Sequence, residues 1–347
     1  MRIAINGYIL SKGISGSAIG LRKIHESLLR LGHEVIIISP QKHYESRILN
    51  LLYLIMWDLW LCTRKAVRLN SEFLIHPCNT GLSTSRIKSL LVIHDTMVID
   101  FKRDFDRGYH IYATIMFWLS ARGARVIMTA SEFSKKSIEN HWQKKNIIVN
   151  YWPIKPVTKS LNENTSGEWT VLWNAAMENH KQPLLLLEII KELRSHLDGK
   201  LYCQIITRDG NASENFKLEL QKIWDWREWI SIQSGLSESE LARIYSMTDV
   251  LLVTSRAEGF CLPALEAMSY GVPVIHSNIP ALIEVCGRSY EDGHPRNSMV
   301  QGCLRYFREP EVFEIAKSKA RTRSLAFSED VFDEKLSLAI AKVLEVR

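Results

Sequence analysis

Alternating runs of apolar and polar residues divide the first half of the chain into short strands and longer helices. Strands are predicted at 2–6, 34–39, 72–76, 90–93 and 126–129. A helix is predicted at 21–31, where apolar residues recur every three or four positions and Gly32 follows as a stop signal. Strands that alternate with helical spacing are typical of parallel βαβ units.

The second half repeats this alternation without repeating the sequence. Strands are predicted at 169–173, 201–207, 229–232 and 250–254. Between the halves, the segment 151–167 contains two prolines and a polar run, which is typical of a domain junction. With 347 residues the chain suits two domains, predicted at 1–160 and 161–327, followed by a helix at 328–347.

The most apolar segment is Ile48–Cys62, which contains Trp60 and is followed by Arg64, Lys65 and Arg68. As a helix, 15 residues extend roughly 22 Å, short of the roughly 30 Å of a bilayer core, so the segment is not expected to cross a membrane. Two interpretations remain open: a helix buried in the core, and an interfacial helix that lies on lipid headgroups.

Composition and charge narrow the class of protein. Hydrophobic residues make up 46% and charged residues 24% of the chain, as in globular proteins. The six cysteines show no metal-ligand or C-x-x-C spacing, and the chain begins with a predicted strand rather than a signal peptide, so we expect a cytoplasmic location.

The positive charge is concentrated in the first half. Residues 1–160 carry 23 lysines and arginines against 11 acidic residues, whereas the remainder is net negative. This asymmetry favours an anionic partner such as a membrane surface, a lipid phosphate or nucleic acid, and a merely soluble basic surface is the alternative. Because no clustered basic and aromatic motif is present, nucleic acid is not an expected partner, whereas peripheral contact with an anionic membrane is.

The densest candidate chemistry follows the strand at 250–254. A polar turn leads to a helix predicted from Pro263, closed by Gly271, so Glu258 lies in the turn and Glu266 about one helical turn past the start. Side chains on a helix lean toward its N-terminus, so both carboxylates are expected to face one pocket. The alternative is that both are ordinary solvated acids.

The same turn offers backbone donors. The N–H groups of Gly259, Phe260, Cys261 and Leu262 lead into the positive end of the helix, which is a typical phosphate site. A diphosphate site beside a carboxylate that accepts hydrogen bonds from vicinal hydroxyls fits a nucleotide-sugar.

The run Glu258-Gly-Phe-Cys-Leu-Pro-Ala-Leu-Glu266-Ala-Met-x-x-Gly-x-Pro-Val-Ile resembles the signature of the retaining GT-B glycosyltransferases of family 4, also called glycosyl transferases group 1. The resemblance implies an α/β fold of two Rossmann-like domains that face each other across a cleft, with the last helix crossing back to the first domain. It also implies that Glu258 lies beside the donor sugar, that Glu266 binds the ribose, and that the loop amides bind the donor. Cys261 stands where the family usually has glycine.

Three further positions resemble the family pattern. The glycine-rich loop that contains Gly16 is implied to lie against the donor diphosphate, and His94, at the end of a strand, resembles a histidine that meets the sugar from the other domain. Lys181 fits a lysine that binds the diphosphate. A flexible loop, a structural histidine and a surface lysine are the respective alternatives.

One expected charge is missing. The family usually carries an arginine five residues before the lysine, where this chain has Ala176, and His180 or Arg208 are the candidates to replace it. The pair Asp104 and Asp106 resembles the metal-binding D-x-D of GT-A glycosyltransferases, but basic neighbours flank it, so we interpret it as a solvated loop and expect no metal.

Together the resemblance implies a retaining, metal-independent enzyme. It would move a hexose or deoxyhexose from an NDP-sugar, used as a co-substrate without other cofactors, to a hydroxyl of a glycan or lipid-linked acceptor in bacterial surface polysaccharide assembly. His94 and Glu258 are the expected catalytic residues. A non-catalytic nucleotide-sugar-binding protein of the same fold is the alternative, and Ala176 favours it.

Overall fold

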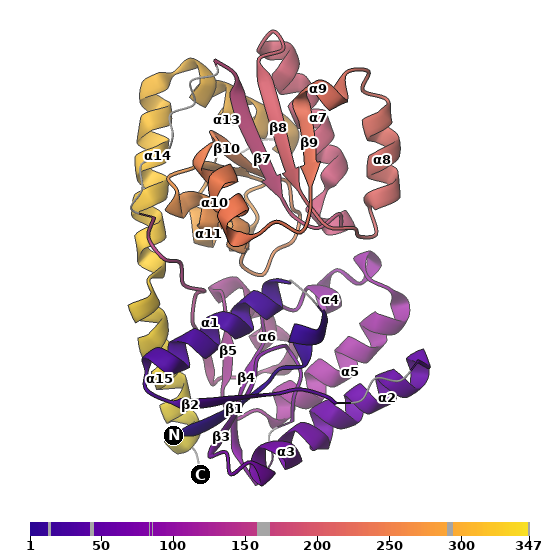
Figure 1. Cartoon of the computed structure of the whole chain (residues 1–347), viewed down its shortest axis with the longest axis vertical. Helices are drawn as coiled ribbons and strands as arrows, with labels where there is room; N and C mark the ends of the chain where they lie inside the picture. Colours follow the sequence, from indigo (N-terminus) through magenta and orange to yellow (C-terminus); the bar gives the residue numbers. More distant parts are fainter. Residues whose placement is uncertain are drawn as a thin grey trace. The chain divides into compact units, whose positions relative to one another are not determined.

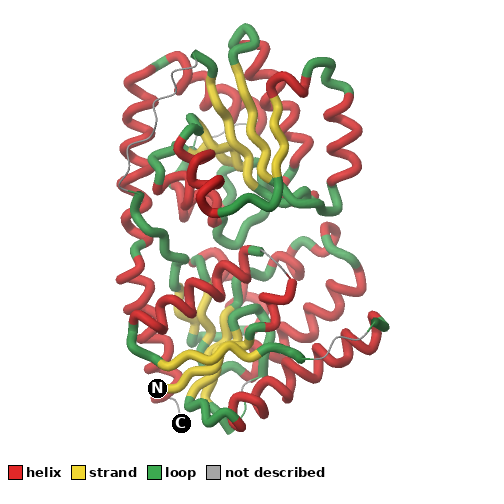
Figure 2. Tube along the Cα trace, viewed as in Figure 1, coloured by secondary structure: helices red, strands yellow, loops and turns green. Residues whose placement is uncertain are grey.

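The computed structural model describes residues 1–12, 15–41, 45–82, 84, 86–157, 167–289 and 294–345. The chain forms two compact units, of which the first comprises Met1–Pro153 and Glu329–Arg347 and the second comprises Ile154–Ser328. The predicted boundary between 160 and 161 lies outside the described residues. Each unit contains a central sheet with helices on both faces (Figures 1 and 2).

The first unit contains a six-stranded parallel sheet in the order β2-β1-β3-β4-β5-β6. Its strands are β1 Arg2–Asn6, β2 Glu34–Ile38, β3 Phe73–His76, β4 Lys88–Val92, β5 Ile127–Thr129 and β6 Ile147–Val149. The five strands predicted in this half are all present, with small shifts at their ends. Strands β3, β5 and β6 are buried along their whole length, as expected for a parallel sheet covered on both faces.

Helices of the first unit cover the two faces of this sheet. They are α1 Gly16–Arg30, α2 Arg47–Met56, the π-helical turn η2 Trp57–Leu61, α3 Cys62–Arg68, α4 Met97–Asp100, α5 Arg107–Gly123, α6 Glu132–Trp142 and α15 Glu329–Glu345, with short 3-10 turns at Tyr8–Lys12 and Lys102–Asp104. Helix α15 packs against α1, where the Arg30 guanidinium bonds Asp333 at 2.8 Å and Glu329 at 2.9 Å. Right-handed crossovers place α3, α5 and α6 on the opposite face.

Helix α1 begins five residues earlier than predicted. The Ser15 hydroxyl accepts a hydrogen bond from the N–H of Ala18 at 3.2 Å and caps the helix, so Gly16 is its first residue rather than part of a loop. A side chain at Gly20 would place its Cβ 2.9 Å from the Trp152 ring and 3.0 Å from His94 Cε1. Glycine is therefore required at position 20 because the Trp152 and His94 rings approach the backbone closely. In the sequence alone, such a glycine looks the same as a glycine in a loop.

The apolar segment 48–62 is a helix with two different faces. Trp57 and Cys62 are buried, whereas Leu52 and Trp60 are exposed, so one side of the segment packs in the core and the other faces outward. In the part of the chain that the structure describes, no helix is both long and apolar enough to cross a membrane.

The second unit contains a five-stranded parallel sheet in the order β11-β10-β7-β8-β9. Its strands are β7 Trp169–Asn174, β8 Leu201–Ile206, β9 Ile230–Gln233, β10 Val250–Val253 and β11 Val274–His276. The core forms between the sheet and its helices, with Trp173, Phe216 and Leu193 among its buried residues.

The helices of the second unit are α7 Pro183–His196, α8 Ser213–Gln221, α9 Trp226–Trp229, α10 Glu238–Ser246, α11 Leu262–Ser269, α12 Pro280–Cys286, α13 Pro295–Arg308 and α14 Pro310–Ser324, with 3-10 turns at Asn179–Lys181 and Leu325–Phe327. A capping box formed by Ser237 and Glu240 starts α10. Helices α10 and α11 lie on one face of the sheet, and α7 and α13 on the other (Figure 1). Gly271 ends α11 with φ +78°, which a left-handed terminator requires.

The strand order reverses at β7. Strands β8 and β9 extend the sheet to one side, and the chain then crosses back to place β10 and β11 on the other side. In open parallel sheets a crevice for ligands forms at such a point, outside the carboxyl ends of the two strands. The loops that follow β7 and β10 are therefore the expected ligand-binding loops of this unit.

Candidate functional site

Lys181 and Glu258 form an ion pair at the carboxyl ends of β7 and β10. Lys181 ends the 3-10 turn that follows β7, and its Nζ lies 2.6 Å from Oε1 of Glu258 in the turn after β10. The Ser255 hydroxyl donates to the same oxygen at 2.7 Å, and Glu258 is only 5% exposed. Two residues that lie far apart in the sequence thus meet at the point where the strand order reverses.

The backbone of Lys181 is also fixed by β10. The Thr254 hydroxyl donates to the carbonyl of Lys181 at 2.6 Å and accepts a hydrogen bond from Nε1 of Trp173 at 3.1 Å. Thr254 and Ser255 were not among the sequence-predicted site residues. Their signal in the sequence is the pair of hydroxyl residues directly after a buried strand, where polar side chains reach the ligand edge of the sheet.

The turn before α11 leads into the helix as predicted. Gly259 and Phe260 are buried, and Phe260 packs edge-on against Phe327 with ring centroids 5.9 Å apart. Cys261 is the N-cap of α11, with the helix starting at Leu262. The first amides of a helix have no partner within the helix, so this start can bind an anion.

Cys261 holds an unusual backbone conformation. Its φ of +75° lies in the left-handed region, which costs a residue with a side chain roughly 1–2 kcal/mol. Burial, followed by the charge of Glu258, raises the pKa of its thiol well above the usual value, so the thiol is neutral at pH 7. Strain of this kind persists where surrounding contacts over-determine the backbone, which is common at binding sites.

Glu266 is held by two residues that the sequence analysis did not single out. Its Oε2 accepts a hydrogen bond from the Tyr245 hydroxyl at 2.9 Å, and that hydroxyl accepts one from Nδ2 of Asn174 at 3.0 Å. Burial and then the charge of Glu266 raise the pKa of Tyr245 well above its usual value. Because Asn174 ends β7, Glu266 is tied to the same strand that leads to Lys181.

The loop after β7 contains Ala176, at the position where the family usually has an arginine, and two nearby residues are candidates to supply that charge. The N–H of Met177, next to it, donates to the carbonyl of Arg208 at 3.0 Å, so Arg208 lies beside this loop, at the end of β8, and is exposed. His180 is 7% exposed, and its carbonyl accepts a hydrogen bond from the N–H of Arg256. Of the two candidates to replace the arginine, Arg208 is the one with an exposed charge at the strand ends.

His94 and Gly16 belong to the first unit. His94 follows β4, is 9% exposed, and its Nε2 lies 2.7 Å from the carbonyl of Pro77. A carbonyl only accepts, so Nε2 carries the proton and Nδ1 is an acceptor. Burial lowers the pKa of His94 to about 4, so the ring is neutral at pH 7. Gly16 lies in the first turn of α1, where no atom of another described segment lies within 4 Å of its Cβ position, so crowding by those residues does not require glycine there.

The aspartates at 104 and 106 have structural roles. The Asp106 side chain accepts a hydrogen bond from the N–H of Tyr109 at 3.0 Å and caps α5. Asp104 is 7% exposed, so the prediction of a solvated loop is wrong for this residue, which a 3-10 turn carries inward. Among the described residues, no group of three or more histidine, cysteine, aspartate or glutamate side chains is arranged to hold a metal ion.

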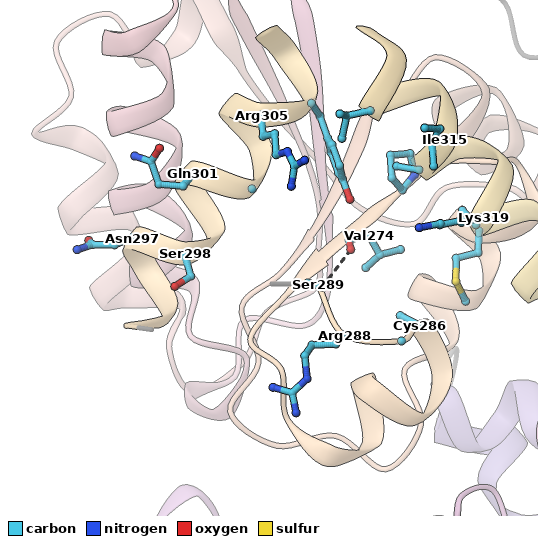
Figure 3. Close-up of a pocket in the computed structure, with 18 of the residues that line it drawn as sticks. Val274, Cys286, Arg288, Ser289, Asn297, Ser298, Gln301, Arg305, Ile315 and Lys319 are labelled. Carbon is cyan, nitrogen blue, oxygen red and sulfur yellow. Dashed lines mark hydrogen bonds between the residues drawn. The ribbon is translucent and has the colours of Figure 1, made fainter. Parts of the chain in front are cut away.

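A cavity of about 840 Å³ lies in the second unit (Figure 3). Helices α12, α13 and α14 surround it beside the edge strand β11, and Arg288, Arg305 and Lys319 contribute basic groups to its lining. The Ser289 hydroxyl donates to the carbonyl of Val274 at 3.3 Å along its wall. The pair formed by Lys181 and Glu258 does not line this cavity, so the two features are separate.

Comparison with known proteins identifies the family. The family described as "Glycosyl transferases group 1" matches residues 158–293. The O-antigen chain mannosyltransferase B of Escherichia coli is 31% identical over 277 residues, which covers 76% of this chain and 72% of that protein. The chain belongs to the group 1 glycosyltransferases. This membership was predicted from the run between Glu258 and Glu266, and it is confirmed.

A solved structure resembles the whole chain, and a second relative resembles part of it. Sucrose-phosphate synthase from Thermosynechococcus elongatus has a TM-score of 0.80 at 14% identity and covers 99% of both chains, which shows the GT-B fold predicted from the sequence. The MMP alpha-(1->4)-mannosyltransferase of Mycolicibacterium hassiacum is 36% identical over 104 residues, which covers 29% of this chain and 24% of that relative. The part of the chain matched by the group 1 glycosyltransferase family contains Lys181, Glu258 and Glu266, whereas His94 lies outside it.

Proposed function

We propose that this protein is a retaining glycosyltransferase that moves a hexose or deoxyhexose from a nucleoside diphosphate sugar to a hydroxyl group. The observation that carries the proposal is the meeting of Lys181, Glu258 and the start of α11 at the carboxyl ends of β7 and β10. A cation, a buried carboxylate and a helix N-terminus at one edge of a sheet match the diphosphate and hydroxyl groups of such a donor.

In this proposal the leaving diphosphate is bound without a metal. Lys181 and the amides of Gly259, Phe260, Cys261 and Leu262 bind the phosphate oxygens, and the exposed guanidinium of Arg208 supplies the charge absent at Ala176. An ammonium group has three donors, so bonding to Glu258 is compatible with bonding to a phosphate oxygen. Preorganised donors of this kind stabilise the charge that develops as the diphosphate departs.

The sugar and ribose are assigned to the remaining site residues. Glu266, oriented by Tyr245, accepts hydrogen bonds from the vicinal hydroxyls of the ribose, and Glu258 does the same for the sugar. Nδ1 of His94 accepts from a sugar hydroxyl, and the first turn of α1 at Gly16 contacts the diphosphate. These last two assignments require that both units bind the same donor.

The chemical step is a displacement on one face of the sugar. The bond from the anomeric carbon to the diphosphate oxygen breaks, the acceptor oxygen bonds to that carbon from the same side, and the proton of the acceptor hydroxyl passes to the departing phosphate. The anomeric configuration is therefore retained, and no cofactor beyond the NDP-sugar co-substrate takes part.

The relatives guide the choice of substrates. The two relatives described above carry mannosyltransferase in their names, and one name refers to an O-antigen chain, which supports a mannosyl donor as the first to test. We include a glycan or lipid-linked acceptor of bacterial surface polysaccharide assembly, a cytoplasmic location and peripheral contact with an anionic membrane in the proposal.

Thermal-shift titration with UDP-, GDP- and dTDP-sugars tests donor binding, because a ligand that binds the folded state raises the Tm. Transfer is then followed with the donor that binds, and the anomeric configuration of the product is read by NMR. Glu258→Gln is expected to abolish transfer while the protein stays folded, and Glu219→Gln, an exposed acid of the same unit, is expected to change nothing. Unchanged turnover of Glu258→Gln would remove Glu258 from its role.

A nucleotide-sugar-binding protein without catalysis is the second candidate, and Ala176 is the residue that favours it. Donor binding without transfer or hydrolysis over a broad acceptor panel is the outcome expected for that candidate. Ala176→Arg distinguishes the two further, because a restored charge should raise turnover only in a protein that already catalyses transfer.

A further inference from the structure

An apolar stripe runs along the solvent-facing side of α2, η2 and α3. Leu49, Leu52, Met56 and Trp60 follow one another at helical spacing, and each exposes between 45% and 52% of its surface. Arg64, one turn further, places its guanidinium 4.9 Å from the centre of the Trp60 ring. The stripe therefore ends in a cation stacked on an exposed tryptophan.

Helix α5 carries a similar apolar stripe, which also ends in an arginine next to an exposed tryptophan. Ile111, Ile115 and Trp118 are spaced by four and three residues, and each is 46% to 52% exposed. The guanidinium of Arg122 lies 5.5 Å from the centre of the Trp118 ring. The buried residues of α5, such as Phe117 and Ala121, lie on other sides of the helix, so this stripe faces away from the core.

The two helical segments are neighbours on one face of the first unit. The N–H of Gly81 donates to the Ser120 hydroxyl of α5 at 3.0 Å, and the N–H of the adjacent Leu82 donates to the carbonyl of Asp58 in η2. Burial, and after it the charge of Asp58, raises the pKa of Tyr112 in α5. In Figure 1, α5 and α2 accordingly extend along the same region of this unit.

Two exposed apolar stripes on neighbouring helices are uncommon on a surface that meets only water, because monomeric proteins rarely expose large apolar patches. We propose that these stripes, here called the docking face, bind the surface of an anionic lipid bilayer. The docking face comprises the following residues: Leu49, Leu52, Met56, Trp60, Arg64, Ile111, Ile115, Trp118 and Arg122. The inference deepens the membrane contact included in the proposed function.

Its chemistry fits lipid headgroups. Tryptophan and arginine each combine an apolar body with a polar end, which suits the boundary between acyl chains and headgroups. Residues 1–160, which include the docking face, carry 23 basic against 11 acidic residues. A bilayer with negative headgroups complements that charge, whereas a second copy of this chain would bring the same positive charge against it.

Vesicle co-sedimentation tests the docking face on the full chain. The protein is expected to bind vesicles of phosphatidylcholine with phosphatidylglycerol, and to bind phosphatidylcholine alone far more weakly. The double variant Trp60→Ser/Trp118→Ser is expected to reduce partition on the order of tenfold or more, because buried aromatic area is lost. Arg64→Gln and Arg122→Gln are each expected to reduce it about fivefold on anionic vesicles, since one basic group near such a surface contributes about 1 kcal/mol.

A matched control separates the docking face from general surface hydrophobicity. Trp224 is 98% exposed in the second unit, so Trp224→Ser removes an exposed tryptophan outside the docking face and should leave partition unchanged. Equal losses in the control and the double variant would overturn the proposal, as would a wild-type protein that ignores anionic vesicles. A wild-type dimer that the double variant converts to monomer would assign the face to self-association and refute lipid binding.

The experiment also keeps this inference distinct from the proposed function. Transfer to a water-soluble acceptor in the absence of vesicles is expected to be the same in wild type and in Trp60→Ser/Trp118→Ser. Lost partition with intact transfer supports the docking face, whereas intact partition in a protein without any transfer would contradict the proposed function alone.

Discussion

Because Lys181 and Glu258 form a largely buried ion pair, we predict that replacing the lysine lowers the stability of the protein more than replacing the glutamate. In Lys181→Met, the Glu258 carboxylate, which is 5% exposed in the native protein, would lose the ammonium group and keep the Ser255 hydroxyl as a donor to Oε1. Removing one partner of a buried pair leaves an uncompensated charge, so the variant should lose about 3–5 kcal/mol of unfolding free energy. Because the carboxylate cannot reach water easily, this is the more damaging of the two single substitutions.

Glu258→Gln should be milder. The amide oxygen can still accept a hydrogen bond, and the Lys181 side chain is 17% exposed on a flexible stem that can turn toward water. We expect a loss of about 1–2 kcal/mol. The double variant Lys181→Met/Glu258→Gln removes both charges, so it should be no worse than Lys181→Met, and the coupling energy of the cycle should be at least about 1–2 kcal/mol.

Urea unfolding followed by tryptophan fluorescence measures the four free energies, with comparable m-values as the condition for using them. The second unit provides a matched control, because Lys222 and Glu219 also lie 2.6 Å apart but on the surface. An exposed pair of that kind should couple by no more than about 0.5 kcal/mol. A coupling between Lys181 and Glu258 as small as that of the exposed pair, or a larger loss in Glu258→Gln than in Lys181→Met, would refute the reasoning.

Three further substitutions test the site and its surroundings. Cys261→Gly should stabilise the protein by about 1 kcal/mol in urea unfolding, since glycine adopts a φ of +75° without strain, and a loss of stability would contradict this. Tyr245→Phe should weaken binding of a nucleoside diphosphate by on the order of tenfold in calorimetry through the lost bond to Glu266, while Tyr270→Phe should not. His76 is fully buried, both its ring nitrogens lack hydrogen-bond partners among the described residues, and burial lowers its pKa to about 4. The neutral form of His76 therefore supports folding above pH 6.5, and this contribution to the free energy of unfolding falls as the pH drops toward 4. Between pH 6.5 and 5, His76→Leu should lose about 2 kcal/mol less unfolding free energy than wild type, and equal losses would exclude this role.

The sequence predicts the architecture well because its signals are local. The strand, turn and helix around Glu258 are set by a buried run, by Pro263 near the helix start and by Gly271 at its end, and each of these acts within a few residues. The capping box of α10 is local in the same way. Family membership followed from this stretch alone.

Features that depend on distant residues were not predictable in this way. The early start of α1 was missed because Gly20 is required by Trp152, which lies far along the chain. Tyr245 was missed because its partner Glu266 lies on another helix. The exposed stripe on α5 was missed as well, since periodicity shows that a helix has an apolar face but does not show whether the fold covers it.

The direct bond between Lys181 and Glu258 illustrates what controls the site. Local patterns place Lys181 after one strand and Glu258 after another, and the family resemblance implies a separate contact with the donor for each. Only the strand order makes β7 and β10 neighbours, and their parallel pairing, Val250 with Val171, brings both loops to the same edge. Since the chain reaches β10 from β9, on the far side of β7, the crossover creates the pair, and a binding site built in this way depends on long-range topology more than on the identity of either loop.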